Sequence, residues 1–263
     1  MHMQTPKISD LAGMPVALDL RRRLGNDSST HWIDGRRGAS MDGASRRPKW
    51  PADGCDPTLP GAGDALLVVD LQRDFLPGGS LPVSGADRVV RRINRCLDLF
   101  AECELPVFFS RNWHPATYCS FQEQGGEFPR HCVEGSAGAA FADDLRLPMQ
   151  LRIVSKSTRP EHDSCSAFDG TDLAGRLRAG GVNRLFVGGL ATDHCVLQTV
   201  KDARELGFDV VVLRDAVAAI DARPGDGRRA LARMQELGAS LVDSEEIVGH
   251  VALRPAGRPA PGS

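Results

Sequence analysis

Apolar runs alternate with amphipathic stretches along the chain from residue 64 onward. The runs at 65–69, 106–110, 153–154, 185–187, 209–215 and 240–242 predict strands, and the longest of them are typical of strands buried on both faces. Apolar residues at helical spacing predict helices near 89–100, 172–179, 196–206 and 225–237. This order predicts an α/β fold, a Rossmann-like three-layer α/β/α arrangement with a mostly parallel central sheet.

Three of these strands end on residues that can carry chemistry. The first runs into Asp70, the third into Lys156, and the fourth is followed by Gly188-Gly189 and then by Cys195 at the start of a helix. Ligands bind at the carboxyl edge of such sheets, and all three side chains are expected there. Unpaired N–H groups and the helix dipole favour a thiolate in a first helical turn. The sequence therefore predicts a nucleophilic cysteine beside an acid and an ammonium group.

Each residue alone has a plainer interpretation. An acid after a strand often caps a helix or meets solvent, a single lysine is more often a surface residue, and a free cysteine is commonly buried structure. The three together, in matching local sequence, favour the catalytic interpretation.

The local sequences Val-Val-Asp-Leu-Gln-x-Asp-Phe at 68–75, the lone Lys156, and Gly-x-Ala-Thr-Asp-His-Cys-Val at 189–196 resemble a known family. They are similar to the nicotinamidase branch of the isochorismatase-like cysteine hydrolases, over about residues 63 to 245. The resemblance implies the isochorismatase-like hydrolase fold and an amidase that converts nicotinamide to nicotinate and ammonia through a cysteine thioester. The predicted organisation is an Arg/Gly/Ser/Pro-rich flexible extension at 1–62, the hydrolase domain at 63–250, and a loose Pro/Gly-rich tail at 251–263.

In this scheme Asp70 is the general base and then the acid, Lys156 lowers the cysteine pKa by its charge, and Cys195 attacks the amide carbonyl. The backbone N–H of Cys195 is one candidate donor to the oxyanion. The resemblance implies Ala191 as the other, after a cis Leu190–Ala191 peptide. It also implies that Phe75 and Phe128 form aromatic walls around a flat substrate ring, although both also suit a plain core.

The resemblance further implies a divalent metal, zinc, manganese or iron, held by an Asp-x-His-Pro motif and a later histidine. The corresponding residues are Asn112, His114 and His131, so an amide replaces the expected carboxylate and metal affinity should fall. Glu123 or Glu127 in the same loop are candidate replacements. In the plainer interpretation, His114 and His131 are polar loop residues that bind no metal. We interpret His194 as structural, because its side chain diverges from that of Cys195.

Composition sets the remaining limits. The 263 residues are 41% hydrophobic with a net charge of −2, which allows one sizeable core and suggests no nucleic-acid partner. Seven cysteines in no dense, even pattern favour a reducing cytoplasm over a disulfide framework. No apolar run is long enough to span a membrane. The expected partner is a small-molecule amide, and a homo-oligomer is compatible with the sequence.

Three alternatives stay open. Another cysteine amidohydrolase of the same fold, acting on a carbamoyl, ureidoacrylate or maleamate-type amide without metal, is favoured by Asn112. The second alternative is isochorismate-type vinyl ether hydrolysis, which is less favoured because it does not require the cysteine. The third is a non-catalytic binding relative, which is less favoured because it would not need Asp70, Lys156 and Cys195 together.

Overall fold

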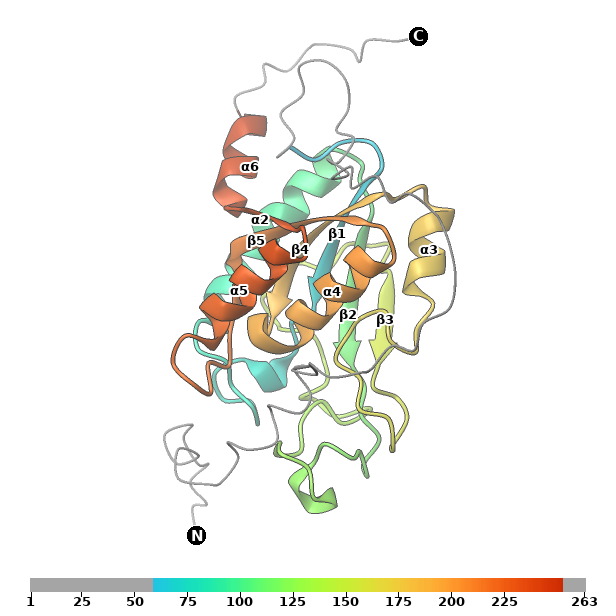
Figure 1. Cartoon of the computed structure of the whole chain (residues 1–263), viewed down its shortest axis with the longest axis vertical. Coiled ribbons are helices and arrows are strands. Elements are labelled where there is room, and N and C mark those ends of the chain that lie inside the picture. The colour runs from blue at the N-terminus through green and yellow to red at the C-terminus, as the bar shows by residue number, and fades with distance from the viewer. Residues whose placement is uncertain (1–58, 253–263) are drawn as a thin grey trace, which may run out of the picture. The chain divides into compact units, whose positions relative to one another are not determined.

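The computed structural model describes residues 59–252, and within them six parallel strands form one sheet in the order β3-β2-β1-β4-β5-β6. The strands are β1 (Asp64–Val69), β2 (Val107–Asn112), β3 (Ile153–Lys156), β4 (Arg184–Leu190), β5 (Asp209–Ala218) and β6 (Ser240–Val242). The predicted α/β fold with its parallel central sheet is confirmed (Figure 1). The predictions for residues 1–58 and 253–263 lie outside the described residues.

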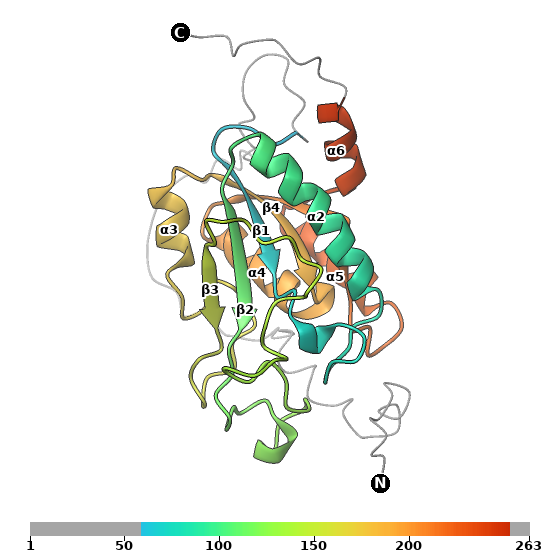
Figure 2. The same ribbon diagram turned by 180° about the vertical axis from the view of Figure 1, so that it is seen from behind.

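Helices cover both faces of the sheet because successive strand residues point to opposite sides. On β1, Leu66 and Val68 pack in the cluster that includes α2 (Ala86–Glu102) and α6 (Ser244–Ala252). The alternate residues of β1 pack with α3 (Leu173–Ala179), α4 (Leu197–Glu205) and α5 (Asp226–Glu236). Figure 1 shows α3, α4 and α5 in front of the sheet, and Figure 2 shows α2 and α6 on the opposite face.

The chain reverses its direction of travel across the sheet between β1 and β4, which are neighbours. From β1 it crosses through α2 to β2, and from β4 it crosses through α4, on the other face, to β5. The carboxyl ends of two such strands border the crevice where α/β proteins bind ligands. The residues that follow β1 and β4 therefore lie at the natural position for a site.

Two elements differ from the sequence predictions. Helix α6 was not predicted, and it packs Ile247 against the core on the α2 side of the sheet. The segment Thr192–Val196 forms a π-helical turn before α4, so Cys195 precedes the regular helix instead of opening it. The Ala191 carbonyl accepts the N–H groups of both His194 and Val196, each at 3.1 Å, which widens this turn.

Two short 3-10 helices, η3 (Arg73–Phe75) and η4 (Gln122–Gln124), complete the described elements outside the sheet and its helices. Among residues 59–252, no helix combines the length and the apolar character needed to cross a bilayer.

Candidate active site

Strand register brings Asn112 and Lys156 together. They are direct partners where β2 pairs with β3, and register partners in a parallel pair point to the same face. Val154, two residues before Lys156, belongs to the core on the α4 side, so Lys156 extends toward the turn that carries Cys195. Asp70 follows β1 with φ of +49°, and this left-handed conformation takes it out of the pleat of the strand. Residues from three strands thereby meet at one edge.

The ammonium group of Lys156 is buried, and each of its three N–H donors has an acceptor. Nζ lies 2.9 Å from Asp70 Oδ2, donates to Cys195 Sγ at 3.3 Å, and donates to Asn112 Oδ1. The side chains of Asp70 and Lys156 are both 0% exposed. A buried charge is tolerated only when it is paired and hydrogen-bonded, and this arrangement meets that condition.

The carboxylate of Asp70 is equally well held. The Ser110 hydroxyl donates to Oδ1 at 2.6 Å, and the Asn112 amide donates to Oδ2 at 3.2 Å. The side-chain amide of Gln72 in turn hydrogen-bonds both backbone groups of Asn112, at 2.7 and 2.8 Å. Sequence reasoning did not identify Gln72 or Ser110. Ser110 ends the apolar run of the second predicted strand, but its pairing with Val69, the last residue of β1, depends on register, which the sequence does not show.

The surroundings raise the pKa of both Lys156 and Cys195, which keeps the ammonium charged and the thiol neutral. Burial disfavours the Lys156 ammonium, but Asp70 and Cys195 outweigh burial and raise its pKa, so the group stays charged. The Cys195 thiol hydrogen-bonds Cys165 and is buried, and both effects raise its pKa, whereas Lys156 lowers it. Lys156 acts in the predicted direction, but the hydrogen bond with Cys165 and burial outweigh it, so the net pKa of Cys195 is raised.

Cys165 is a third residue, after Gln72 and Ser110, that the sequence did not assign. Its contact with the Cys195 sulfur lowers the pKa of Cys165 to about 7, with Lys156 acting in the same direction. The segment carrying Cys165 is anchored to α4 by the hydrogen bond from the Ala167 N–H to Thr199 Oγ1 at 3.0 Å. No local pattern around residue 165 signals this contact, which depends on the loop after β3.

The backbone before Cys195 is shaped for close approach. The Leu190–Ala191 peptide bond is cis, as the resemblance implied. Gly189 has φ of +128°, and a Cβ there would lie 2.0 Å from the Val69 carbonyl oxygen, so β4 can sit this close to β1 only with glycine. The turn that follows places the predicted oxyanion donors, Ala191 and Cys195, four residues apart on the same segment.

The loop between β2 and β3 brings the two predicted histidines together. His114 N–H donates to the Cys132 carbonyl at 3.0 Å, and His114 forms a parallel bridge with Val133. The imidazole rings of His114 and His131 are consequently 4.9 Å apart, and both residues are buried. The Asp74 carboxylate accepts the Cys132 N–H at 2.6 Å, which fixes this loop to the turn after β1.

The predicted aromatic residues border the same histidine. The ring centroids of Phe75 and Phe128 lie 5.7 and 5.9 Å from that of His131, and Phe128 also lies 6.0 Å from His194. Phe75 is 7% exposed and packs in the core, whereas Phe128 is only partly buried. Phe128 thus links the histidine pair to the residue next to Cys195, while Phe75 serves the core as well.

With this geometry established, comparisons with known proteins identify the family. The Isochorismatase domain model matches residues 64–246, most of the chain. The chain belongs to the isochorismatase family. The nicotinamidase of Escherichia coli (strain K12) is 36% identical over 209 residues, which cover 70% of this chain and 98% of that protein. The resemblance to the nicotinamidase branch is confirmed.

Two solved structures show the same fold. A pyrazinamidase of Pyrococcus horikoshii in complex with zinc is 44% identical, with a TM-score of 0.66 over 69% of this chain and 99% of that chain. PnC1 from L. infantum in complex with nicotinate is 37% identical, with a TM-score of 0.64 over 72% and 96% of the two chains.

Because a solved relative is in complex with zinc, the question arises whether the described residues of this chain supply a complete set of metal ligands. The histidines suit a metal: among residues 59–252 neither ring nitrogen of His114 meets a partner at full hydrogen-bond geometry, although the Ser157 backbone lies near enough to act on the ring. His131 Nδ1 donates to the Pro129 carbonyl at 2.8 Å, which leaves Nε2 available. Burial, with His131 and Lys156 nearby, lowers the pKa of His114 to about 2, so its ring is neutral. Two imidazole nitrogens are therefore well placed.

The third predicted donor does not join them. The amide of Asn112 is engaged at both ends, with Lys156 and with Asp70. Glu123 and Glu127 are exposed, and Glu123 pairs with Arg130 at 3.2 Å. Among residues 59–252, no three His, Cys, Asp or Glu side chains form a group suited to a metal ion. The described residues therefore do not fit the predicted divalent ion.

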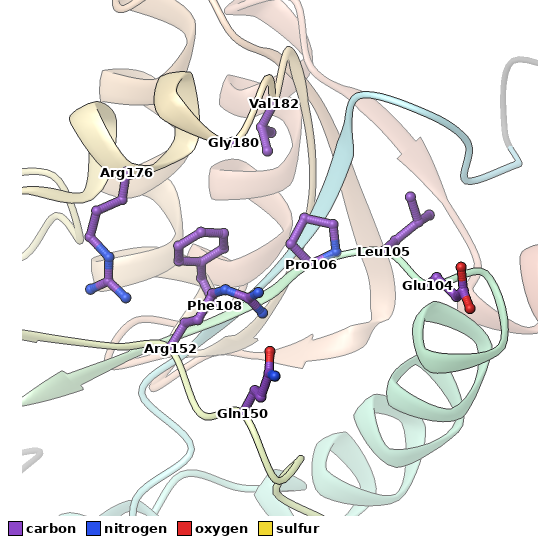
Figure 3. Close-up of a pocket in the computed structure, with 9 residues that line it drawn as sticks. All are labelled: Glu104, Leu105, Pro106, Phe108, Gln150, Arg152, Arg176, Gly180 and Val182. Atoms are coloured by element: carbon purple, nitrogen blue, oxygen red, sulfur yellow. The ribbon is translucent and has the colours of Figure 1, made fainter.

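A separate cavity of about 470 Å³ lies at the other edge of the sheet (Figure 3). Its lining includes Leu105 and Pro106, just before β2 begins, and Gln150 and Arg152, just before β3 begins. Asp70, Lys156 and Cys195 are at the carboxyl ends of the strands, so this cavity is not part of the candidate active site.

Proposed function

We propose that the chain is an amidase that hydrolyses nicotinamide to nicotinate and ammonia, with Cys195 as the nucleophile. The observation that carries the proposal is the buried contact of Lys156 with both Asp70 and Cys195, in a family whose relatives include nicotinamidases. A carboxylate, an ammonium group and a thiol at a strand edge are the parts required for acyl transfer to sulfur.

The acid–base step follows from the resting charges. Cys195 is a thiol at rest, so its proton must leave as sulfur attacks the amide carbon, and Asp70 is the base that accepts it. Lys156 stabilises the thiolate as it forms, because its charge lies 3.3 Å from the sulfur. We assign the backbone N–H groups of Ala191 and Cys195 to the oxyanion.

Collapse of the tetrahedral adduct breaks the C–N bond, and Asp70 returns the proton to the departing ammonia. Asp70 then deprotonates a water molecule that attacks the thioester carbon, the C–S bond breaks to release the carboxylic acid, and Asp70 returns the proton to the Cys195 sulfur. We assign Phe128 and Phe75 to the walls around the substrate ring, since both lie against His131. None of these steps uses a metal ion.

The test is ammonia release from nicotinamide by the purified full-length chain. We expect Cys195→Ala to abolish release, and Cys103→Ala, at the end of α2 away from the sheet's carboxyl edge, to leave it unchanged. Release that survives Cys195→Ala would contradict the nucleophile assignment.

The same assay decides between nicotinamide and the second candidate, a carbamoyl, ureidoacrylate or maleamate-type amide, which the engaged amide of Asn112 favours. A panel of these amides is compared at equal concentration. Faster release from an acyclic amide than from nicotinamide would assign the second function.

We also propose three further assignments. They are the domain limits 63–250 with flanking extensions, a cytoplasmic location inferred from cysteine usage, and a small-molecule amide as the partner.

A further inference from the structure

Asn112 occupies the position where the family resemblance implies a metal-binding carboxylate, yet its contacts are with the catalytic groups. Its side-chain oxygen accepts from Lys156 Nζ, and its side-chain NH₂ donates to Asp70 Oδ2 at 3.2 Å. The residue is 4% exposed, and Gln72 fixes its backbone from both sides. The side chain cannot turn toward the histidines without breaking its two buried hydrogen bonds, and the two bonds from Gln72 keep the backbone from moving with it.

Strand register fixes this orientation of the Asn112 side chain. Asn112 and Lys156 are directly paired between β2 and β3, so their side chains leave the sheet at the same level and on the same face. The amide is the group that can serve both neighbours at once, since it accepts from an ammonium and donates to a carboxylate. A carboxylate at residue 112 could accept from Lys156 but could not donate to Asp70.

Charge balance supports the same conclusion. Around Asn112, the carboxylate of Asp70 and the ammonium of Lys156 balance each other, and the amide between them is neutral. An aspartate at residue 112 would add a second buried carboxylate, which needs a further cation or a proton. With Asn112 these groups require neither.

We propose that Asn112 is a positioning residue that bridges Asp70 and Lys156, and that the chain performs its amidase reaction without a divalent metal. The inference deepens the proposed function and rests on it. His114 and His131 then remain as a pair of neutral imidazoles beside the substrate walls, available to hydrogen-bond a heteroatom of the substrate.

The first experiment needs no substrate. The rate of Cys195 alkylation by iodoacetamide is followed by mass spectrometry across pH for the wild type, Asn112→Ala and Asn183→Asp, an exposed control. We expect Asn112→Ala to react about tenfold more slowly near neutral pH, with its profile displaced by about one unit to higher pH, because Lys156 is no longer held against the sulfur. The control should match the wild type.

The second experiment measures metal directly. Wild type and Asn112→Asp are dialysed against Zn²⁺ or Mn²⁺, passed through a desalting column and analysed for metal content. We expect the wild type to retain far less than one ion per chain, and Asn112→Asp to retain more, since a carboxylate at residue 112 cannot donate to Asp70, is repelled by it and can turn toward the two imidazoles. Activity of the wild type should survive a strong chelator.

Kinetics supply the third measurement. Asn112→Ala should lower kcat about 100-fold with little change in KM, as expected when catalytic groups are misplaced but the pocket is intact. An unchanged alkylation profile in Asn112→Ala, or about one tightly held ion per wild-type chain, would overturn the inference. If nicotinamide is not hydrolysed, the proposed function fails separately, because alkylation and metal content still decide the role of Asn112.

Discussion

Removal of the Lys156 ammonium should cost stability on a scale set by the burial of its partner. In Lys156→Met the apolar side chain fills similar space, but the carboxylate of Asp70, 0% exposed and 2.9 Å from Nζ in the wild type, loses its counter-charge. Breaking a buried pair by removing one partner costs about 3–5 kcal/mol. Domains of this kind are stable by about 5–15 kcal/mol, so the loss should be a large fraction of the total.

The assay is urea unfolding of the wild type, Lys156→Met, Asp70→Asn and the double variant, followed by far-UV circular dichroism. Since the double variant has no unpaired charge, it should lose at least about 2 kcal/mol less than the sum of the single losses. Lys201→Met is the matched control: Lys201 is half exposed and lies 4.0 Å from Glu205 on α4, so its loss should stay below about 0.5 kcal/mol. A Lys156→Met loss no larger than that of Lys201→Met would refute the reasoning.

Two further predictions concern the framework of the site, both measured by urea unfolding. Gly189→Ala should lower the free energy of unfolding by about 2 kcal/mol or more, because the new Cβ would lie 2.0 Å from the Val69 carbonyl oxygen at a φ of +128°. Gly175→Ala is the control, since a Cβ there meets nothing within 4 Å, and it should show no such loss. Equal stability of the two variants would contradict the close approach. Asp193→Asn should lose about 1–3 kcal/mol at pH 7. Burial alone would raise the pKa of Asp193, but His194 and two backbone N–H groups outweigh it and lower the pKa below 3.8, so this stabilisation is present above about pH 4 and is lost as pH falls through the lowered value. A stability difference between the wild type and Asp193→Asn that is the same at pH 7 and at about pH 3 would show that the carboxylate charge is not responsible.

The strands and their order along the chain could be predicted from sequence because each is a short apolar run ending at a turn or a polar residue. β1 stops before Asp70 and β3 stops at Lys156, and both ends were predicted from the pattern. The sheet edge at which these residues meet followed from the rule for parallel strands. Helix α6 could not be predicted in this way, because Ile247 acquires its role only through packing beside α2.

The direction of individual side chains was beyond local pattern. The local sequence around Asn112 resembles a metal-binding motif with one residue replaced. Only the pairing of β2 with β3 shows that the amide faces Lys156. The contact between Cys165 and Cys195 likewise joins a loop to a turn 30 residues later in sequence. Register and loop closure are long-range properties, so one sequence read in short windows does not contain them.

The pKa of Cys195 depends on several neighbouring groups, and its position in the fold alone does not determine it. Lys156 favours the thiolate, but the hydrogen bond with Cys165 and burial outweigh it and keep the proton on sulfur. A thiol at rest requires a base during attack, which gives Asp70 a necessary role rather than a supporting one. Asp70 can serve as that base only while it stays beside Lys156, and Asn112 and Ser110 are the two side chains that keep it there.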